Sequence, residues 1–286
     1  MKNKANGWLS GLAGVVIFAG SLPATRLAVA DFTPLFLTSA RASLAAVAAL
    51  LLLALGRQRM PQRADLFSLM VVAMGVVIGF PLLTAFALQD VSAAHSLMYL
   101  GLLPLCTAAF GVVRGERRPQ PAFWLFSLAG GAVVASYALA AKESHASWQD
   151  LLTIAAVIVC GAGYAEGARV ARGLGGWQTI AWALALALPV ALPIAALTWP
   201  ASFQAVTFSA WMGLGYVSLF SMLIGFIFWY HGLAKGGTAA IGQLQLLQPF
   251  IGFGFAALFL HESISGVMLA CALAALGCVA GAKKFA

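Results

Sequence analysis

Polar side chains within long apolar stretches are the residues of this sequence best suited to bind a small polar molecule. Gln243, Gln245 and Gln248 fall in one such stretch, and Tyr164 and Glu166 fall in another. A glutamine amide can donate to a carboxylate or accept from an ammonium group without burying a charge of its own. The alternative is that each Gln only holds neighbouring helices together, which contributes about 0.6 to 2 kcal/mol.

Aromatic and hydroxyl side chains in further apolar stretches are candidates for the remaining wall of such a cavity. Phe80 and Thr84 share one stretch, and His95 and Tyr99 share the next. An apolar cavity with few polar groups accepts varied ligands, so we expect broad specificity. The complete set of candidate binding residues is Phe80, Thr84, His95, Tyr99, Tyr164, Gln243, Gln245 and Gln248.

The composition indicates that these stretches lie in a membrane. Of the 286 residues, 62% are hydrophobic and only 8% are charged, and the mean hydropathy is +0.96. An ordinary soluble domain has about 25% charged residues. The net charge of +8 does not indicate nucleic-acid binding, because the basic residues gather at the ends of the apolar stretches. The sequence therefore predicts an all-α polytopic protein whose surroundings are the lipid bilayer.

Ten apolar segments are long enough to cross a bilayer, which takes about 20 residues each. They are expected near 8–28, 34–55, 66–88, 92–113, 121–140, 149–169, 178–198, 209–233, 238–259 and 264–282. If the chain starts inside the cell, nearly all Lys and Arg residues outside the segments fall on the cytoplasmic side. This bias predicts a multi-pass protein with both termini in the cytoplasm, and the compact loops favour the bacterial inner membrane. A signal peptide ending at Ala30 is an alternative reading of the first segment, and we favour its retention as a helix.

The second half of the chain repeats the first. Ser92 is paired with Thr238 and Glu116 with Glu262, each 146 residues further along. Because each half holds five segments, an odd number, the two copies must have opposite orientations in the membrane. We therefore expect two inverted five-helix repeats, residues 1–143 and 144–286, around a central cavity.

Four residues are candidates for coupling or gating. Pro104 and Pro249 interrupt equivalent helices of the two halves, and paired breaks near the midplane point to a transport site. Gly163 could act as a hinge, and Glu166 is the carboxylate most plausibly inside a segment. The alternatives are helix kinks that only help packing, close packing at Gly163, and a structural ion pair between Glu166 and Arg169.

Several residues together resemble a known family. They are Arg41 early in the second segment, the small residues that open the fourth and ninth segments, Leu246 to Phe250 (LLQPF) and Leu260 to Glu262 (LHE). The chain resembles the EamA type of the drug/metabolite transporter superfamily over essentially its whole length, and most of all its bacterial amino-acid exporters. The resemblance implies a ten-helix basket that exports amino acids by alternating access. Other metabolites, such as nucleosides, sugars or cationic drugs, and a channel-like facilitator remain alternatives.

Other classes of function find little support in the sequence. There is no phosphate-binding Gly-Lys-Ser/Thr loop, and the four Cys residues show no metal-ligand spacing. His95 next to Ser96 is a weak candidate for nucleophilic chemistry, because adjacent residues point to different faces of a helix. We expect a protein that is not an enzyme, needs no cofactor or metal and functions as a monomer. The sequence shows no buried pair of carboxylates such as a proton antiporter commonly uses. This favours a facilitator or a weakly coupled exporter.

Overall fold

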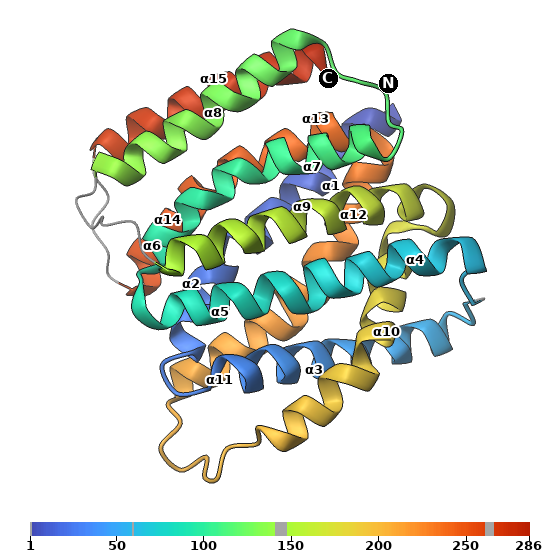
Figure 1. Ribbon diagram of the computed structural model, residues 1–286, viewed down its shortest axis with the longest axis vertical. Coiled ribbons are helices and arrows are strands. Elements are labelled where there is room, and N and C mark those ends of the chain that lie inside the picture. Colours follow the sequence, from blue (N-terminus) through green and yellow to red (C-terminus); the bar gives the residue numbers. More distant parts are fainter. Residues whose placement is uncertain (1, 59, 141–147, 261–265) are drawn as a thin grey trace.

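Helices joined by short loops make up the computed structural model, which describes residues 2–58, 60–140, 148–260 and 266–286 (Figure 1). The first half contains α1 (Lys2–Ala19), α2 (Ser21–Ala28), α3 (Pro34–Leu55), α4 (Arg63–Val72), η1 (Ala73–Gly79), α5 (Phe80–Asp90), α6 (Ala93–Tyr99), η2 (Leu100–Leu102), α7 (Leu103–Val113) and α8 (Pro121–Ala140). The second half contains α9 (Trp148–Leu174), α10 (Gly176–Leu197), α11 (Phe208–Gly215), η3 (Tyr216–Gly225), α12 (Phe226–Gly236), α13 (Thr238–Gly242), η4 (Gln243–Leu247), α14 (Gln248–Leu260) and α15 (Gly266–Phe285).

Consecutive helical elements combine into passes through the membrane. Seven passes within the described residues are long and apolar enough to span it: Asn6–Ala28, Pro34–Leu55, Arg63–Asp90, Trp148–Leu174, Gly176–Leu197, Phe208–Gly236 and Thr238–Phe259. Leu100–Val113 and Pro121–Val133 are shorter apolar helices, and α15 completes the ten passes of the described chain. The polytopic all-α fold expected from the sequence is therefore confirmed.

Irregular helical segments occur at equivalent places in the two halves. The third and eighth passes contain the π-helical segments η1 and η3, and the fourth and ninth contain the 3₁₀ segments η2 and η4. Packing shows the same relation, because α3 lies against α10 and α8 against α15, while α1 packs on α12 as α9 packs on α5 (Figure 1). Two five-helix copies in opposite orientations produce this pattern. The predicted boundary between residues 143 and 144 lies outside the described residues.

The start of α1 and the end of α15 lie together, as Figure 1 shows for the two chain ends. The Lys283 ammonium group lies 4.1 Å from the centre of the Trp8 ring, which connects these two helices directly. We call this side of the molecule the terminal end and the other side the opposite end. Basic side chains gather at the terminal end, as the next section describes.

Local sequence explains how several passes begin. Thr33 caps α3, since its hydroxyl accepts a hydrogen bond from the Phe36 amide, and Pro34 occupies the first turn of the helix. Gly175 and Gly237 have φ values of +106° and +91°, which side chains other than Gly rarely adopt. They allow the abrupt turns from α9 to α10 and from α12 to α13. Both turns lie at the terminal end, where they position the polar residues described below.

Candidate functional site

A small closed cavity lies between the two halves of the molecule. Its volume is about 20 Å³, enough for about one water molecule. The lining comes from both halves: Phe18, Ser21, Leu22, Arg41, Val76, Phe80, Pro81 and Leu103 from the first, and Tyr164, Ser221, Met222, Phe226 and Gln248 from the second. The two π-helical segments contribute Val76 and Ser221 to this lining. Such segments are frequent at functional sites, because the wider turn leaves backbone groups and side chains displaced from regular helix positions.

Arg41 is the only charged residue among those that line the cavity. Its side chain extends from α3 and is only 4% exposed. Its one hydrogen bond within the described chain runs from Nη2 to the Ser221 hydroxyl at 3.5 Å, and Nε has no partner there. No described carboxylate forms an ion pair with it. Removing an ion from water costs several kcal/mol unless a partner compensates, so this buried cation has an unmet need for an anion.

Two hydroxyl groups and an amide line the cavity together with Arg41. Ser21 and Ser221 share a hydrogen bond of 2.7 Å that joins α2 to η3. The Gln248 amide donates to the Phe18 carbonyl at 3.4 Å, where α14 meets α1. The cavity therefore combines one fixed positive charge with neutral groups that can donate and accept hydrogen bonds.

Aromatic rings close the cavity on the side of the terminal end. The Tyr164 ring centre lies 5.9 Å from Phe226, 5.4 Å from Trp229 and 6.5 Å from Phe18. Trp229 and the neighbouring Tyr230 are completely buried. These rings come from α1, α9 and α12, so the closure again involves both halves of the chain.

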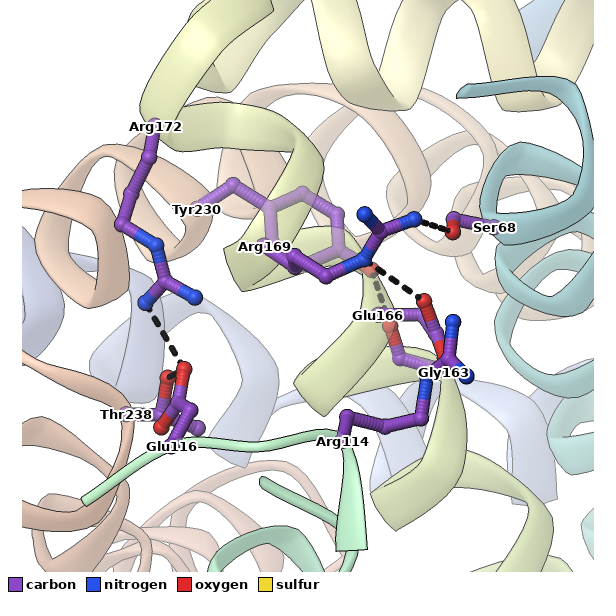
Figure 2. A network of polar contacts seen from close by, with 9 residues as sticks. All are labelled: Ser68, Arg114, Glu116, Gly163, Glu166, Arg169, Arg172, Tyr230 and Thr238. Carbon is purple, nitrogen blue, oxygen red and sulfur yellow. Dashed lines mark hydrogen bonds and ion pairs between the residues drawn. The ribbon is translucent and has the colours of Figure 1, made fainter. Parts of the chain in front are cut away.

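Beyond the rings, Glu166 forms the first ion-pair cluster of the terminal end (Figure 2). The carboxylate is 4% exposed and accepts from Arg114, which follows α7, and from Arg169 Nε at 3.3 Å. Arg169 also donates to the Ser68 hydroxyl of α4. Glu166 and its two arginines therefore join α9 to two helices of the other half.

Glu116 forms a second cluster beside the first (Figure 2). Its Oε1 accepts from Arg172 Nη1 at 2.7 Å and from the Thr238 hydroxyl at 2.8 Å. The Tyr230 hydroxyl donates to the Gly163 carbonyl at 3.2 Å and holds α12 against α9. Both clusters place a carboxylate where residues of the two halves meet.

An open vestibule of about 600 Å³ lies at the terminal end of the molecule, outside these clusters. Its basic lining residues are Arg114, Arg117, Arg169, Arg172 and Lys283, and Glu116 is the acidic side chain among them. Glu166 pairs with Arg114 and Arg169 of the vestibule, and Tyr164, two residues before it on α9, lines the central cavity.

The structure places three of the eight candidate binding residues at the cavity. Phe80, Tyr164 and Gln248 line it directly. They come from the third, sixth and ninth passes, and therefore from both halves of the chain. Their roles in binding stay predictions.

The other candidates lie elsewhere. The Thr84 hydroxyl bonds the carbonyl groups of Phe80 and Pro81 within its own helix, and Tyr99 bonds Asp150. Gln243 donates to the Ser127 hydroxyl at 2.8 Å, which joins η4 to α8. Gln245 is completely buried, and its amide has no described partner. The side chain of His95 lies outside the described residues.

The coupling candidates lie where helices change geometry or pack closely. Pro104 is the second residue of α7, just after η2, and Pro249 is the second residue of α14, just after η4, so both mark real interruptions of a pass. A Cβ at Gly163 would collide with the Val76 side chain, which indicates close packing of α9 on η1. The expected pair between Glu166 and Arg169 is present, and Arg114 adds a second cation.

Sequence reasoning missed the contribution of Arg41, Ser21 and Ser221 to the site. Arg41 is a charge within an apolar helix, and such a residue is by default a candidate for function. That signal was available in the sequence. The two serines carry no comparable signal, because Ser side chains are common in helix interfaces of membrane proteins.

The fold and the site together define a membrane transporter built from two inverted repeats. The chain belongs to the EamA-like transporter family, whose model matches residues 5–139 and 147–282. These two matches are two copies of the family's repeat, one in each half of the chain.

Another protein and a solved structure are also similar to the chain. A Bacillus subtilis (strain 168) protein with the name uncharacterized transporter YdeK is 55% identical to the chain, and the match covers the full length of both proteins. A solved crystal structure of another protein superposes on it with a TM-score of 0.77 at 18% identity, and the match covers 98% of this chain and 97% of that one. At this level of identity the second comparison shows the fold alone.

Proposed function

We propose that the protein exports amino acids across the bacterial inner membrane by alternating access through the central cavity. The observation that carries the proposal is the closed cavity lined by both halves of the chain, with one buried cation, hydrogen-bonding groups and aromatic rings. Rocking of one repeat against the other opens such a site to one side at a time. An amino acid offers a carboxylate, an ammonium group and a side chain, and the cavity has a matching group for each.

The terminal end is the cytoplasmic side in this proposal. The five basic residues of the vestibule give that side the positive charge typical of cytoplasmic loops. Export then begins when a substrate enters the vestibule, and the Glu166 and Glu116 clusters separate to admit it. The site is complete within one chain, which supports a functional monomer.

The cavity must expand to hold an amino acid, since its present volume suits about one water molecule. In the proposed cycle, the side chains that line the cavity therefore move apart when substrate enters. The side chains around Arg41 are mostly apolar or aromatic, which favours neutral substrates, including aromatic ones. Since no described lining residue is Asp, Glu or His, the cavity contains no carboxylate to exchange protons, which supports facilitated or weakly coupled export.

Uptake of radiolabelled amino acids into liposomes containing the purified protein tests the proposal. We expect saturable uptake that unlabelled amino acids compete and that a pH gradient changes little. Gln248→Ala should raise the half-saturation concentration about tenfold, the effect of about 1.4 kcal/mol of lost hydrogen bonding.

Gln243→Ala is the matched control, because it removes the same side chain from the same pass at a place away from the cavity. It should leave the half-saturation concentration unchanged. Absence of amino-acid uptake by correctly inserted protein contradicts the proposal, and uphill transport driven by a pH gradient contradicts weak coupling.

A further inference from the structure

The geometry points to Arg41 as the binding site for the carboxylate group of the transported molecule, with Ser21 and Ser221 beside it. The inference rests on the proposed function and deepens it, since it names organic carboxylates as the substrate class. It excludes amines, sugars and cationic compounds that lack a carboxylate.

The first support is the isolation of the charge. An Arg side chain stays protonated in proteins, so burial cannot remove its charge. Arg41 is 4% exposed, and the described residues offer it one long hydrogen bond of 3.5 Å and no carboxylate. Arg41 is therefore a group at the centre of the protein that can bind an anion, and no carboxylate of the described chain is bound to it.

The second support is the geometry of the free donors. The guanidinium has five N–H groups in a planar fork, and a carboxylate can accept two of them in parallel. Nε has no partner in the described chain, and Ser221 is already bonded to Ser21 at 2.7 Å. The two hydroxyls can donate to a carboxylate, and the Gln248 amide oxygen, on the same cavity lining, can accept from the ammonium group of an amino acid.

The third support is the charge of the approach. Arg114, Arg117, Arg169, Arg172 and Lys283 line the vestibule at the terminal end, against one acidic side chain, Glu116. A cleft lined with one sign of charge raises the local concentration of ions of the other sign. The vestibule therefore favours entry of molecules with a carboxylate and disfavours cations.

Thermal unfolding of the detergent-purified full chain with pairs of ligands tests the inference. Each pair shares a side chain and differs at the carboxylate: alanine and alaninamide, leucine and leucinamide, phenylalanine and phenylalaninamide. A fourth ligand, 3-phenylpropanoate, keeps the carboxylate and lacks the ammonium group. A ligand that binds only the folded state raises Tm. We expect the acids to raise Tm and the amides to bind about 10- to 100-fold more weakly, because they lose charge-assisted hydrogen bonds.

Variants separate a binding role from a structural one. Arg41→Met keeps much of the volume and removes the unpaired charge, so Tm without ligand should stay the same or rise while stabilisation by acids disappears. Arg41→Lys keeps the charge without the fork and should retain part of the preference. Ser221→Ala should weaken the binding of acids and leave that of amides unchanged, which provides a test should Arg41→Met fail to fold.

Three results overturn the inference: equal stabilisation by acids and amides, a preference for acids that survives Arg41→Met, or no stabilisation by any acid. These results are distinct from failure of the proposed function. If 3-phenylpropanoate binds through Arg41 but amino acids are not transported, the carboxylate site stands and amino-acid export does not. If amino acids are transported with no dependence on Arg41, export stands and the carboxylate site does not.

Discussion

Glu166 is the residue whose contacts at the terminal end are most readily tested, because two arginines share its carboxylate. It is almost fully buried and accepts from Arg114 of one half and Arg169 of its own helix, and Arg169 reaches on to Ser68. Breaking a buried ion pair by removing one partner leaves an uncompensated charge. Here two arginines would lose their shared partner at once, so the contact between halves weakens at this point.

Glu166→Gln should therefore open the path from the vestibule toward the cavity. Cys160 lies one helical turn from Tyr164 and is 1% exposed, which makes it a reporter of this opening. In a variant that keeps Cys160 and replaces Cys106, Cys271 and Cys278 with Ala, Glu166→Gln should make modification by a small methanethiosulfonate reagent severalfold faster. Arg117→Gln is the control, since it changes the vestibule charge without breaking a described ion pair. Equal rates in all three proteins would contradict a closing role for Glu166.

Close packing of α9 on α12 is the element-scale feature that supports the site. The Tyr230 ring lies directly over Gly167, and its hydroxyl reaches Gly163 on the same face of α9. Glycines four residues apart allow helices in a membrane to approach closely. A Cβ at Gly167 would collide with the buried Tyr230 ring, which cannot move aside as the end of a flexible side chain can.

Gly167→Ala should destabilise the folded protein by about 1 to 3 kcal/mol, the usual cost of overpacking. Gly173→Ala on the same helix is the matched control, because no atom lies within 4 Å of the added Cβ. Without overpacking, replacing Gly with Ala in a helix is favourable, so the control should be neutral or slightly stabilising. Thermal unfolding of both variants in detergent checks the difference, and equal Tm values would contradict the packing argument.

The helices could be predicted from the sequence because apolar segments, prolines and the internal repeat are patterns of residue types. The residues of the cavity could be predicted only in part. Segment lengths, the paired prolines and the repeat all follow from the order of residue types. Gln243 and Gln248 show the limit, since the same side chain five positions apart faces α8 in one case and the cavity in the other. The 3₁₀ segment η4 begins at Gln243 and ends just before Gln248, and its three residues per turn alter the angle between the two side chains from that of a regular α-helix. The residue types alone do not predict this local change of helix type, nor which of the two faces lies toward the cavity.

At the scale of the whole molecule, the two halves are joined by polar contacts at both ends. Glu116 joins them at the terminal end, where it accepts from Arg172 and Thr238. At the opposite end, Asp31 Oδ2 accepts from the Thr207 hydroxyl at 2.6 Å and from the Thr207 amide at 2.8 Å. In the alternating access proposed above these ends separate in turn, so their contacts would set which end opens more easily.

The contact at the opposite end should depend on pH. The hydrogen bond from the Thr207 side chain, followed by the one from its amide, lowers the pKa of Asp31 from the ordinary 3.8. A lowered pKa in the folded state means that the contribution to stability is complete above 3.8 and disappears as pH falls through the lowered value. Asp31→Asn should therefore have a lower Tm than the parent protein at pH 6, and the difference should shrink toward pH 3. A difference that stays constant with pH would contradict this role for the carboxylate.

The fold is nearly symmetric between its halves, whereas its central charge belongs to one of them. Arg41 lies on α3, and α10, the equivalent helix of the second repeat, contains no charged residue. A substrate held by its charged group would keep the same end toward the first repeat whichever side the cavity faces. The rest of the substrate would then have different surroundings in the inward-facing and outward-facing forms. Such a carrier still equalises concentrations at equilibrium, but the concentration that half-fills it should differ between the two sides of the membrane.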